Sequence, residues 1–165
     1  KDLAYFGELG IRGVGYDVSS LKEHLIRTLG IDRTRAVIIA GAGNLGRALA
    51  NYPGFQQDGF EIVAMLDSNP EKVGTSLREH LTIRSIEEIE KIVDDHDVEI
   101  GVLAVPAEAA QAVYDRMVEA GIRSIMNFAP AQIDERPEVK LKTVDLRVCL
   151  ECLSFHLARQ GGEDA

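Results

Sequence analysis

The sequence predicts an α/β fold in which a parallel β-sheet carries α-helices on both faces. Short, unbroken apolar runs alternate along the chain with segments of helical periodicity, and such runs are typical of strands buried on both faces. The chain has 165 residues, of which 45% are hydrophobic and 27% charged, as in an ordinary globular domain. A chain of this length buries roughly 70% of its unfolded surface, so it needs no disulfide or metal to form a core.

The first elements precede the alternating part of the chain. Residues 1–16 contain four glycines among apolar side chains, which predicts a glycine-rich turn between short extended pieces. Such a hairpin is marginal alone, so we expect a fragment that has lost most of an N-terminal domain. From Val18, apolar residues recur at helical spacing until Gly30, with Ser19 or Ser20 as the N-cap. This pattern predicts a linker helix within residues 17–35.

Residues 36–145 hold the alternating strands and helices. Strands are expected at 36–40, 60–66, 99–105 and 123–127, and helices at 47–52, 85–93 and 107–120. Pro53 and Gly54 are expected to end the first of these helices. Because consecutive strands are joined by helices, the strands should run parallel within one sheet.

The clearest functional signal is a glycine-rich segment between the first buried strand and its helix. It comprises Gly41, Ala42, Gly43, Asn44, Leu45 and Gly46. Gly41 permits a tight turn, Gly43 lets the backbone approach a pyrophosphate, and Gly46 allows close contact between helix and strand. The N-terminus of the helix would offer N–H groups and a positive dipole end to the phosphates. The segment predicts a Rossmann-like dinucleotide-binding domain.

An acidic residue completes this motif. Asp67 ends the next strand, 21 residues after Gly46, where its carboxylate can accept hydrogen bonds from an adenosine ribose. It would repel a 2′-phosphate, which favours NAD over NADP. The alternative is that the glycines form only a tight turn and that Asp67 caps the next segment.

Two later turns are expected to face the same crevice, because ligands bind beyond the carboxyl ends of parallel strands. Val105 and Pro106 follow one strand, and Asn127 and Phe128 follow another. An amide and an aromatic ring at a strand end can flank a nicotinamide ring and its carboxamide. Equally, Pro106 is a residue that any helix can carry in its first turn.

The sequence offers no clear catalytic group for hydride transfer. A dehydrogenase needs a proton donor or acceptor beside the hydride position. None of the four histidines follows a predicted strand, and Tyr52 has no lysine partner at a suitable spacing. We therefore expect a site that binds a nicotinamide without reacting it, and no enzyme.

The C-terminal segment is apolar over nearly its whole circumference. A helix of this kind must be buried on more than one side. Residues 146–165 therefore predict a dimerisation helix and tail, with the helix exchanged between two subunits. The alternative is a terminal helix that docks on its own sheet. Cys149 and Cys152 share one helical face and are expected to be buried, inert thiols rather than half of a zinc site.

Charge and composition exclude several classes of protein. The chain carries 18 Lys+Arg against 27 Asp+Glu, a net charge of -9, so it should not bind nucleic acid or anionic lipid nonspecifically. No apolar run approaches the ~20 residues of a membrane span, and no leader opens the chain. Two cysteines are too few for a disulfide scaffold, which favours a reducing, cytoplasmic location.

Seven segments together resemble the Rex family of bacterial redox-sensing transcriptional repressors. They are residues 2–16, Gly41-Ala-Gly-Asn-Leu-Gly46, Tyr52-Pro-Gly-Phe55, Asp67-Ser-Asn-Pro-Glu-Lys-Val-Gly74, Val105-Pro106, Asn127-Phe-Ala-Pro130 and Val144-Asp-Leu146. The resemblance implies a homodimer whose N-terminal winged helix binds operator DNA and whose Rossmann domain senses the NADH to NAD+ ratio. NADH would release the protein from DNA.

The resemblance also implies roles for particular residues. Residues 1–16 would be the wing of a winged helix that is otherwise absent from this chain, and 36–145 would be the NAD(H)-binding domain. Tyr52, near the cofactor, and Asp145, reaching across from the partner subunit, would form a redox switch. Family members often carry an aromatic residue where this chain has Leu146.

A crevice lined by Val105, Pro106 and Phe128 should prefer NADH, because burying the cationic ring of NAD+ costs desolvation energy. Two other classes remain. An NAD-dependent oxidoreductase would need the proton donor that the sequence lacks. A CoA-binding Rossmann-like domain would place the 3′-phosphate of CoA against Asp67.

Overall fold

The computed structural model describes residues 17–28, 30 and 32–160. The predicted wing at residues 1–16 therefore lies outside the described residues, as do residues 161–165. The helices are α1 (Val18–Thr28), α2 (Asn44–Ala50), α3 (Pro53–Gln57), α4 (Ile89–His96), α5 (Ala107–Glu119) and α6 (Leu146–Gln160). None of the helices in the described part of the chain has the length and apolarity that a membrane crossing requires.

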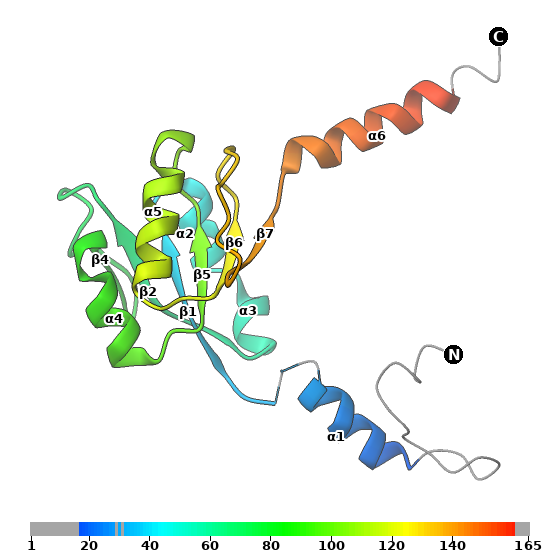
Figure 1. The fold of residues 1–165 in the computed structure, drawn as a ribbon, viewed down its shortest axis with the longest axis horizontal. Coiled ribbons are helices and arrows are strands. Elements are labelled where there is room, and N and C mark those ends of the chain that lie inside the picture. The colour runs from blue at the N-terminus through cyan, green and yellow to red at the C-terminus, as the bar shows by residue number, and fades with distance from the viewer. Residues whose placement is uncertain (1–16, 29, 31, 161–165) are drawn as a thin grey trace. The chain divides into compact units, whose positions relative to one another are not determined.

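One seven-stranded sheet organises the fold (Figure 1). Its strands are β1 (Arg35–Ala40), β2 (Phe60–Asp67), β3 (Ser76–Arg78), β4 (Leu81–Ser85), β5 (Ile100–Leu103), β6 (Ser124–Asn127) and β7 (Lys140–Thr143). Their order across the sheet is β3-β4-β2-β1-β5-β6-β7. The pairs β1–β5, β5–β6, β6–β7 and β2–β4 are parallel, and the short edge strand β3 is antiparallel to β4. The fold class is the predicted one, with one antiparallel edge added.

The chain divides into two compact units. One contains α1, the residues that follow it as far as Arg35, and Pro53–Glu61 with α3. Within this unit, Asp17 caps α1, because its Oδ1 accepts a hydrogen bond from the Ser20 N–H at 2.7 Å. Asp17, rather than Ser19 or Ser20, is therefore the capping residue. The other unit contains the rest of the sheet with α2, α4, α5 and α6.

The core of the sheet unit lies between the strands and the helices α4 and α5. Ile38 and Leu66 from the strands belong to one buried cluster with Ile89 of α4 and Tyr114 of α5. Strand residues of the opposite parity, such as Ile39, are equally buried but lie outside that cluster, as expected of a sheet covered on both faces. Figure 1 shows α5 on one face of the sheet and α2 on the other.

Several element boundaries differ from the predicted ones. The helix expected at 47–52 begins earlier, at Asn44, and Pro53 starts the short helix α3 rather than only ending α2. The helix expected at 85–93 begins as a 3-10 turn (Ile86–Glu88) capped by Ser85, and α4 continues to His96. Strands β3, β4 and β7 were not predicted, since each is short and rich in polar residues.

Candidate functional site

A pocket of about 580 Å³ opens where the strand order reverses. From β1 the chain crosses to β2 on one side and later to β5 on the other, and ligands of α/β sheets bind at such a switch point. Eight of the predicted site residues line this pocket: Gly41, Gly43, Asn44, Leu45, Asp67, Val105, Pro106 and Phe128. They come from the carboxyl ends of β1, β2, β5 and β6, from the loops that follow, and, for Asn44 and Leu45, from the first turn of α2.

The three glycines of the loop serve different physical needs. Gly41 has a φ of 106°, and a Cβ on it would collide with the backbone of Ala104. A Cβ on Gly46 would collide with the carbonyl oxygen of Gly41. By contrast, a Cβ on Gly43 would have no protein atom within 4 Å, so the pocket is open in front of this residue. The site can therefore admit a group such as a pyrophosphate close to the Gly43 backbone.

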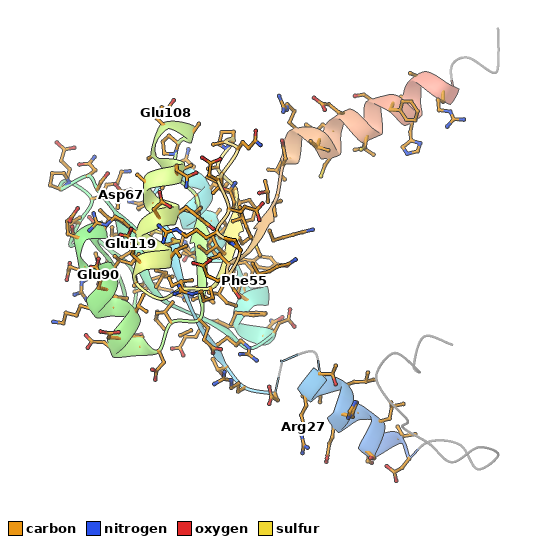
Figure 2. The ribbon with its side chains drawn as sticks, viewed as in Figure 1. Arg27, Phe55, Asp67, Glu90, Glu108 and Glu119 are labelled. Atoms are coloured by element: carbon orange, nitrogen blue, oxygen red, sulfur yellow. The ribbon has the colours of Figure 1, made fainter. Side chains whose placement is uncertain are left out.

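Asp67 is the anchored acid of the site (Figure 2). Its Oδ2 accepts hydrogen bonds from the Ala42 N–H at 2.8 Å and from the Lys72 ammonium at 2.9 Å, and its Oδ1 accepts one from the Asn69 N–H at 2.8 Å. Burial alone would raise the pKa of Asp67, but these hydrogen bonds from Asn69, Lys72 and Ala42 outweigh burial and lower it. The carboxylate is therefore ionised and fixed at the edge of the pocket.

Lys72 and Asn69 are site residues that the sequence reasoning missed. Both line the pocket, and Lys72 forms an ion pair with Asp67. The Asn69 side chain accepts a hydrogen bond from the Glu71 N–H at 2.9 Å. This bond closes a turn, after which Lys72 lies next to Asp67 at the end of β2. The Asn69-Pro70 pair was the available signal, because such a pair marks a turn in the sequence.

Three of the predicted cofactor-binding residues do not line the pocket: Ala42, Asn127 and Gly46, which packs against Gly41. Ala42 is buried, and its backbone N–H is committed to Asp67. Asn127 is fully buried at 0% exposure and is not among the residues that line the pocket, so its predicted contact with a ligand stays a prediction. Its Oδ1 accepts a hydrogen bond from the Ala129 N–H at 2.8 Å, and its Nδ2 donates to Thr143 Oγ1 at 3.5 Å. Asn127 therefore shapes the loop that carries Phe128.

Tyr52 and Asp145, the two residues predicted to form a redox switch, lie at different places in the fold. Tyr52 follows α2 and is 57% exposed. Asp145 precedes α6 and accepts hydrogen bonds on Oδ1 from the N–H groups of Arg147 at 2.9 Å and Val148 at 3.4 Å. It also lines a second pocket of about 530 Å³, which shares Leu45, Phe128 and Pro130 with the first.

The helix α6 is exposed over all its described side chains, residues 146–159. Its large apolar residues include Leu150 at 65% and Leu157 at 70% exposure, so the single chain leaves the apolar side chains of α6 uncovered. Cys149 and Cys152 are exposed free thiols within this single chain, and their expected burial stays a prediction about the dimer. Their burial would require a surface that the single chain does not place over α6.

The charged groups of the first pocket are few. Among its lining residues only Asp67 and Lys72 are charged, and none is a histidine or a tyrosine. The His24, His80, His96 and His156 side chains belong to α1, the turn between β3 and β4, the end of α4, and α6. The Lys72 ammonium is the one cationic group among the lining residues, and it is paired with Asp67.

Comparison with known proteins places the chain among named relatives. A family model described as a CoA binding domain matches residues 32–131. The chain is 44% identical to the redox-sensing transcriptional repressor Rex 1 of Thermotoga maritima, covering 97% of this chain and 76% of the relative. It is 46% identical to the Rex repressor of Streptomyces avermitilis over its whole length, which is 65% of that relative.

Solved structures agree with these relatives. The Rex-family repressor RSP, in complex with β-NAD+ and operator DNA, superposes with a TM-score of 0.87 at 36% identity, covering 99% of this chain and 75% of that one. RSP in complex with β-NADH has a TM-score of 0.80, covering 91% of this chain and 72% of that one. The relatives match this chain in sequence, and RSP matches it in sequence and fold, over most of both chains. The chain therefore belongs to the Rex family of redox-sensing transcriptional repressors.

Proposed function

We propose that the pocket between β1 and β5 binds NADH and NAD+, and that NADH binding releases a homodimer of this protein from operator DNA. The observation that carries the proposal is Asp67, an ionised carboxylate held by the glycine loop beside the open space at Gly43. This is the arrangement that a dinucleotide needs for its ribose and its pyrophosphate. The complexes of RSP with β-NAD+ and operator DNA and with β-NADH support the same ligands for this chain.

Each site residue has a distinct role in this proposal. Gly41 and Gly46 fix the path of the loop, and Gly43 with Asn44 and Leu45 receives the phosphates. Asp67 accepts hydrogen bonds from the ribose hydroxyls. Val105, Pro106 and Phe128 form an apolar wall, which favours the neutral reduced nicotinamide because burial of the cationic oxidised ring costs desolvation energy. NADH then shifts the dimer between two states by its differential affinity for them.

Dimerisation through α6 is part of the same proposal. The two subunits would exchange their α6 helices, and the partner subunit would cover the exposed apolar residues of each helix. Tyr52 and Asp145 would then respond to the redox state, with Asp145 reaching the cofactor site of the other subunit. Residues 17–35 would act as a linker, 36–145 as the nucleotide domain and 146–165 as the dimerisation segment. Action on an operator would place the protein in the cytoplasm.

A regulatory role fits the pocket better than an enzymatic one. The relatives are named transcriptional repressors, although the fold is shared with dehydrogenases such as UDP-D-quinovosamine 4-dehydrogenase, at 20% identity and a TM-score of 0.51. The pocket residues offer a nicotinamide no histidine or tyrosine as a proton donor. CoA is the second candidate ligand, favoured by the description of the matched family model.

The proposal is tested by calorimetric titration of the chain with NADH, NAD+, NADPH and CoA. Calorimetry is suited to this chain because it contains no tryptophan to report binding by energy transfer. We expect NADH to bind more tightly than NAD+, with no turnover of either. Equal affinity for the two redox forms would overturn redox sensing, and tighter binding of CoA than of NADH would favour the second ligand.

A further inference from the structure

The pocket contains a single ion pair, and one member of it is more exposed than the other. Lys72 Nζ lies 2.9 Å from Asp67 Oδ2, and the two side chains are 36% and 9% exposed, respectively. Asp67 is fixed by backbone N–H groups on both of its oxygens. Lys72, by contrast, follows the turn at Asn69 and carries its ammonium on a flexible four-carbon stem. The lysine can therefore turn to a new partner, whereas the carboxylate cannot.

The pair also determines the charge of the pocket. Among the residues that line it, Asp67 is the one anion and Lys72 the one cation, so together they are neutral. A lone carboxylate at this position would repel a phosphate on the ribose. With Lys72 beside it, much of that repulsion is offset, because the ammonium attracts the phosphate that the carboxylate repels. A prediction made from Asp67 alone would therefore overestimate how strongly the site rejects a phosphorylated ribose.

We propose that Lys72 is a specificity-determining residue, which sets how strongly this site discriminates between a ribose with free hydroxyls and a ribose that carries a phosphate. When the ribose is unmodified, Lys72 stays paired with Asp67, and the carboxylate accepts hydrogen bonds from the hydroxyls. When a 2′-phosphate is present, Lys72 turns toward it and reduces the penalty of the nearby carboxylate. This inference rests on the proposed nucleotide site.

The test compares the affinities of NADH and NADPH for the wild-type chain and four variants at one fixed ionic strength. Lys72→Met removes the charge and keeps a long side chain, and Lys72→Arg keeps the charge. Asp67→Asn removes the anion and leaves the lysine. Lys91→Met, on the exposed side of α4, removes one lysine away from the pocket lining and serves as the matched control.

We expect NADPH to bind the wild-type chain measurably, though more weakly than NADH. Lys72→Met should raise the ratio of the NADPH to the NADH dissociation constant by roughly tenfold, since a unit charge near the phosphate is lost. Lys72→Arg and Lys91→Met should leave the ratio within about twofold. Asp67→Asn should lower the ratio by roughly tenfold, because the lysine then acts on the phosphate without competition.

The alternative outcomes are distinct. If Lys72→Met weakens NADH and NADPH equally, the lysine only positions Asp67 and the inference is overturned while the proposed function stands. If NADPH does not bind the wild-type chain at all, the inference is also overturned, since the neutral pair does not then admit a phosphate. If NADH itself does not bind the wild-type chain, the proposed function fails and the inference fails with it. Circular dichroism of each variant separates these results from misfolding.

Discussion

The backbone N–H of Ala42 donates a hydrogen bond to the carboxylate of Asp67 across 25 residues of sequence, with 2.8 Å between Ala42 N and Oδ2. This bond ties the glycine loop after β1 to the end of β2. The two halves of the nucleotide motif are thus held together before any ligand binds. A preorganised carboxylate costs less to engage than one that must be ordered on binding.

Substitution of Gly43 should weaken ligand binding, whereas substitution of Gly46 should lower the stability of the fold. Gly43→Ala meets no protein atom, so we expect the free energy of unfolding to change by less than about 0.5 kcal/mol, while the added methyl reduces NADH affinity. Gly46→Ala meets the Gly41 carbonyl, so we expect about 1–3 kcal/mol of destabilisation. Urea unfolding and NADH titration of both variants check this. Equal destabilisation by both substitutions would contradict the loop geometry.

Asp67 should contribute stability that depends on pH. Its pKa is lowered in the fold, despite burial, by the hydrogen bonds from Asn69, Lys72 and Ala42. Its stabilising contribution is therefore complete above the usual aspartate pKa of about 3.9 and is lost as the pH falls through the lower value of the folded state. We expect Asp67→Asn to destabilise the chain by about 1–3 kcal/mol at neutral pH, and by less in acid.

Urea unfolding at several pH values between neutrality and about 3 measures this difference. The matched control is Glu135→Gln, which changes an exposed acid before β7. A wild-type to Asp67→Asn difference that stays constant down to the lowest pH would show that the carboxylate charge does not stabilise the fold.

Asn127 should act on stability rather than on ligand affinity. Its buried Oδ1 is the acceptor for the Ala129 N–H, so Asn127→Ala leaves that donor without its partner. We expect a loss of about 1–3 kcal/mol in the free energy of unfolding. NADH affinity, measured below the unfolding transition, should change by less than about threefold. Asn51→Ala, at an exposed position, is the control for losing an asparagine side chain.

Asp145 should cap α6, and asparagine at this position should cap the helix equally well. Its Oδ1 receives the N–H groups of Arg147 and Val148. Asparagine and aspartate cap helices about equally, whereas alanine costs about 1 kcal/mol. We expect Asp145→Ala to speed hydrogen exchange at these two amides, and Asp145→Asn to leave it unchanged. If Asp145→Asn also abolishes the response to NADH, the negative charge serves the switch and the side-chain oxygen serves the cap.

The exposed apolar side chains of α6 should support a dimer. Leu150 and Leu153 are 65% and 60% exposed in the single chain. Introducing a charge there, as Leu150→Glu with Leu153→Glu, should dissociate the dimer, because an unpaired buried charge costs several kcal/mol. Analytical ultracentrifugation measures the change, and Glu151→Gln on the same helix is the control. A monomer in the wild-type chain would contradict this role of α6.

The parts of the fold that the sequence predicted have strong local signals. β1, β2, β5 and β6 contain apolar runs that suit burial on both faces, and α5 carries more than three turns of helical periodicity. The glycine loop and Asp67 were found because turn geometry and phosphate access restrict the residue types at those positions. In β4, only Leu81 and Ile83 alternate with exposed Thr82, which is too short a pattern to predict a strand.

Only the tertiary structure determined which site residues contact one another and which side chains face the pocket. The sequence determined that a glycine loop and an acid follow two buried strands, because that pattern is local and chemically restrictive. It did not determine that Lys72 neutralises Asp67, or that Asn127 turns inward, away from the pocket. Such pairings depend on the directions of side chains brought together by the sheet. The identity of a residue and its spacing along the chain do not by themselves determine the direction in which its side chain points.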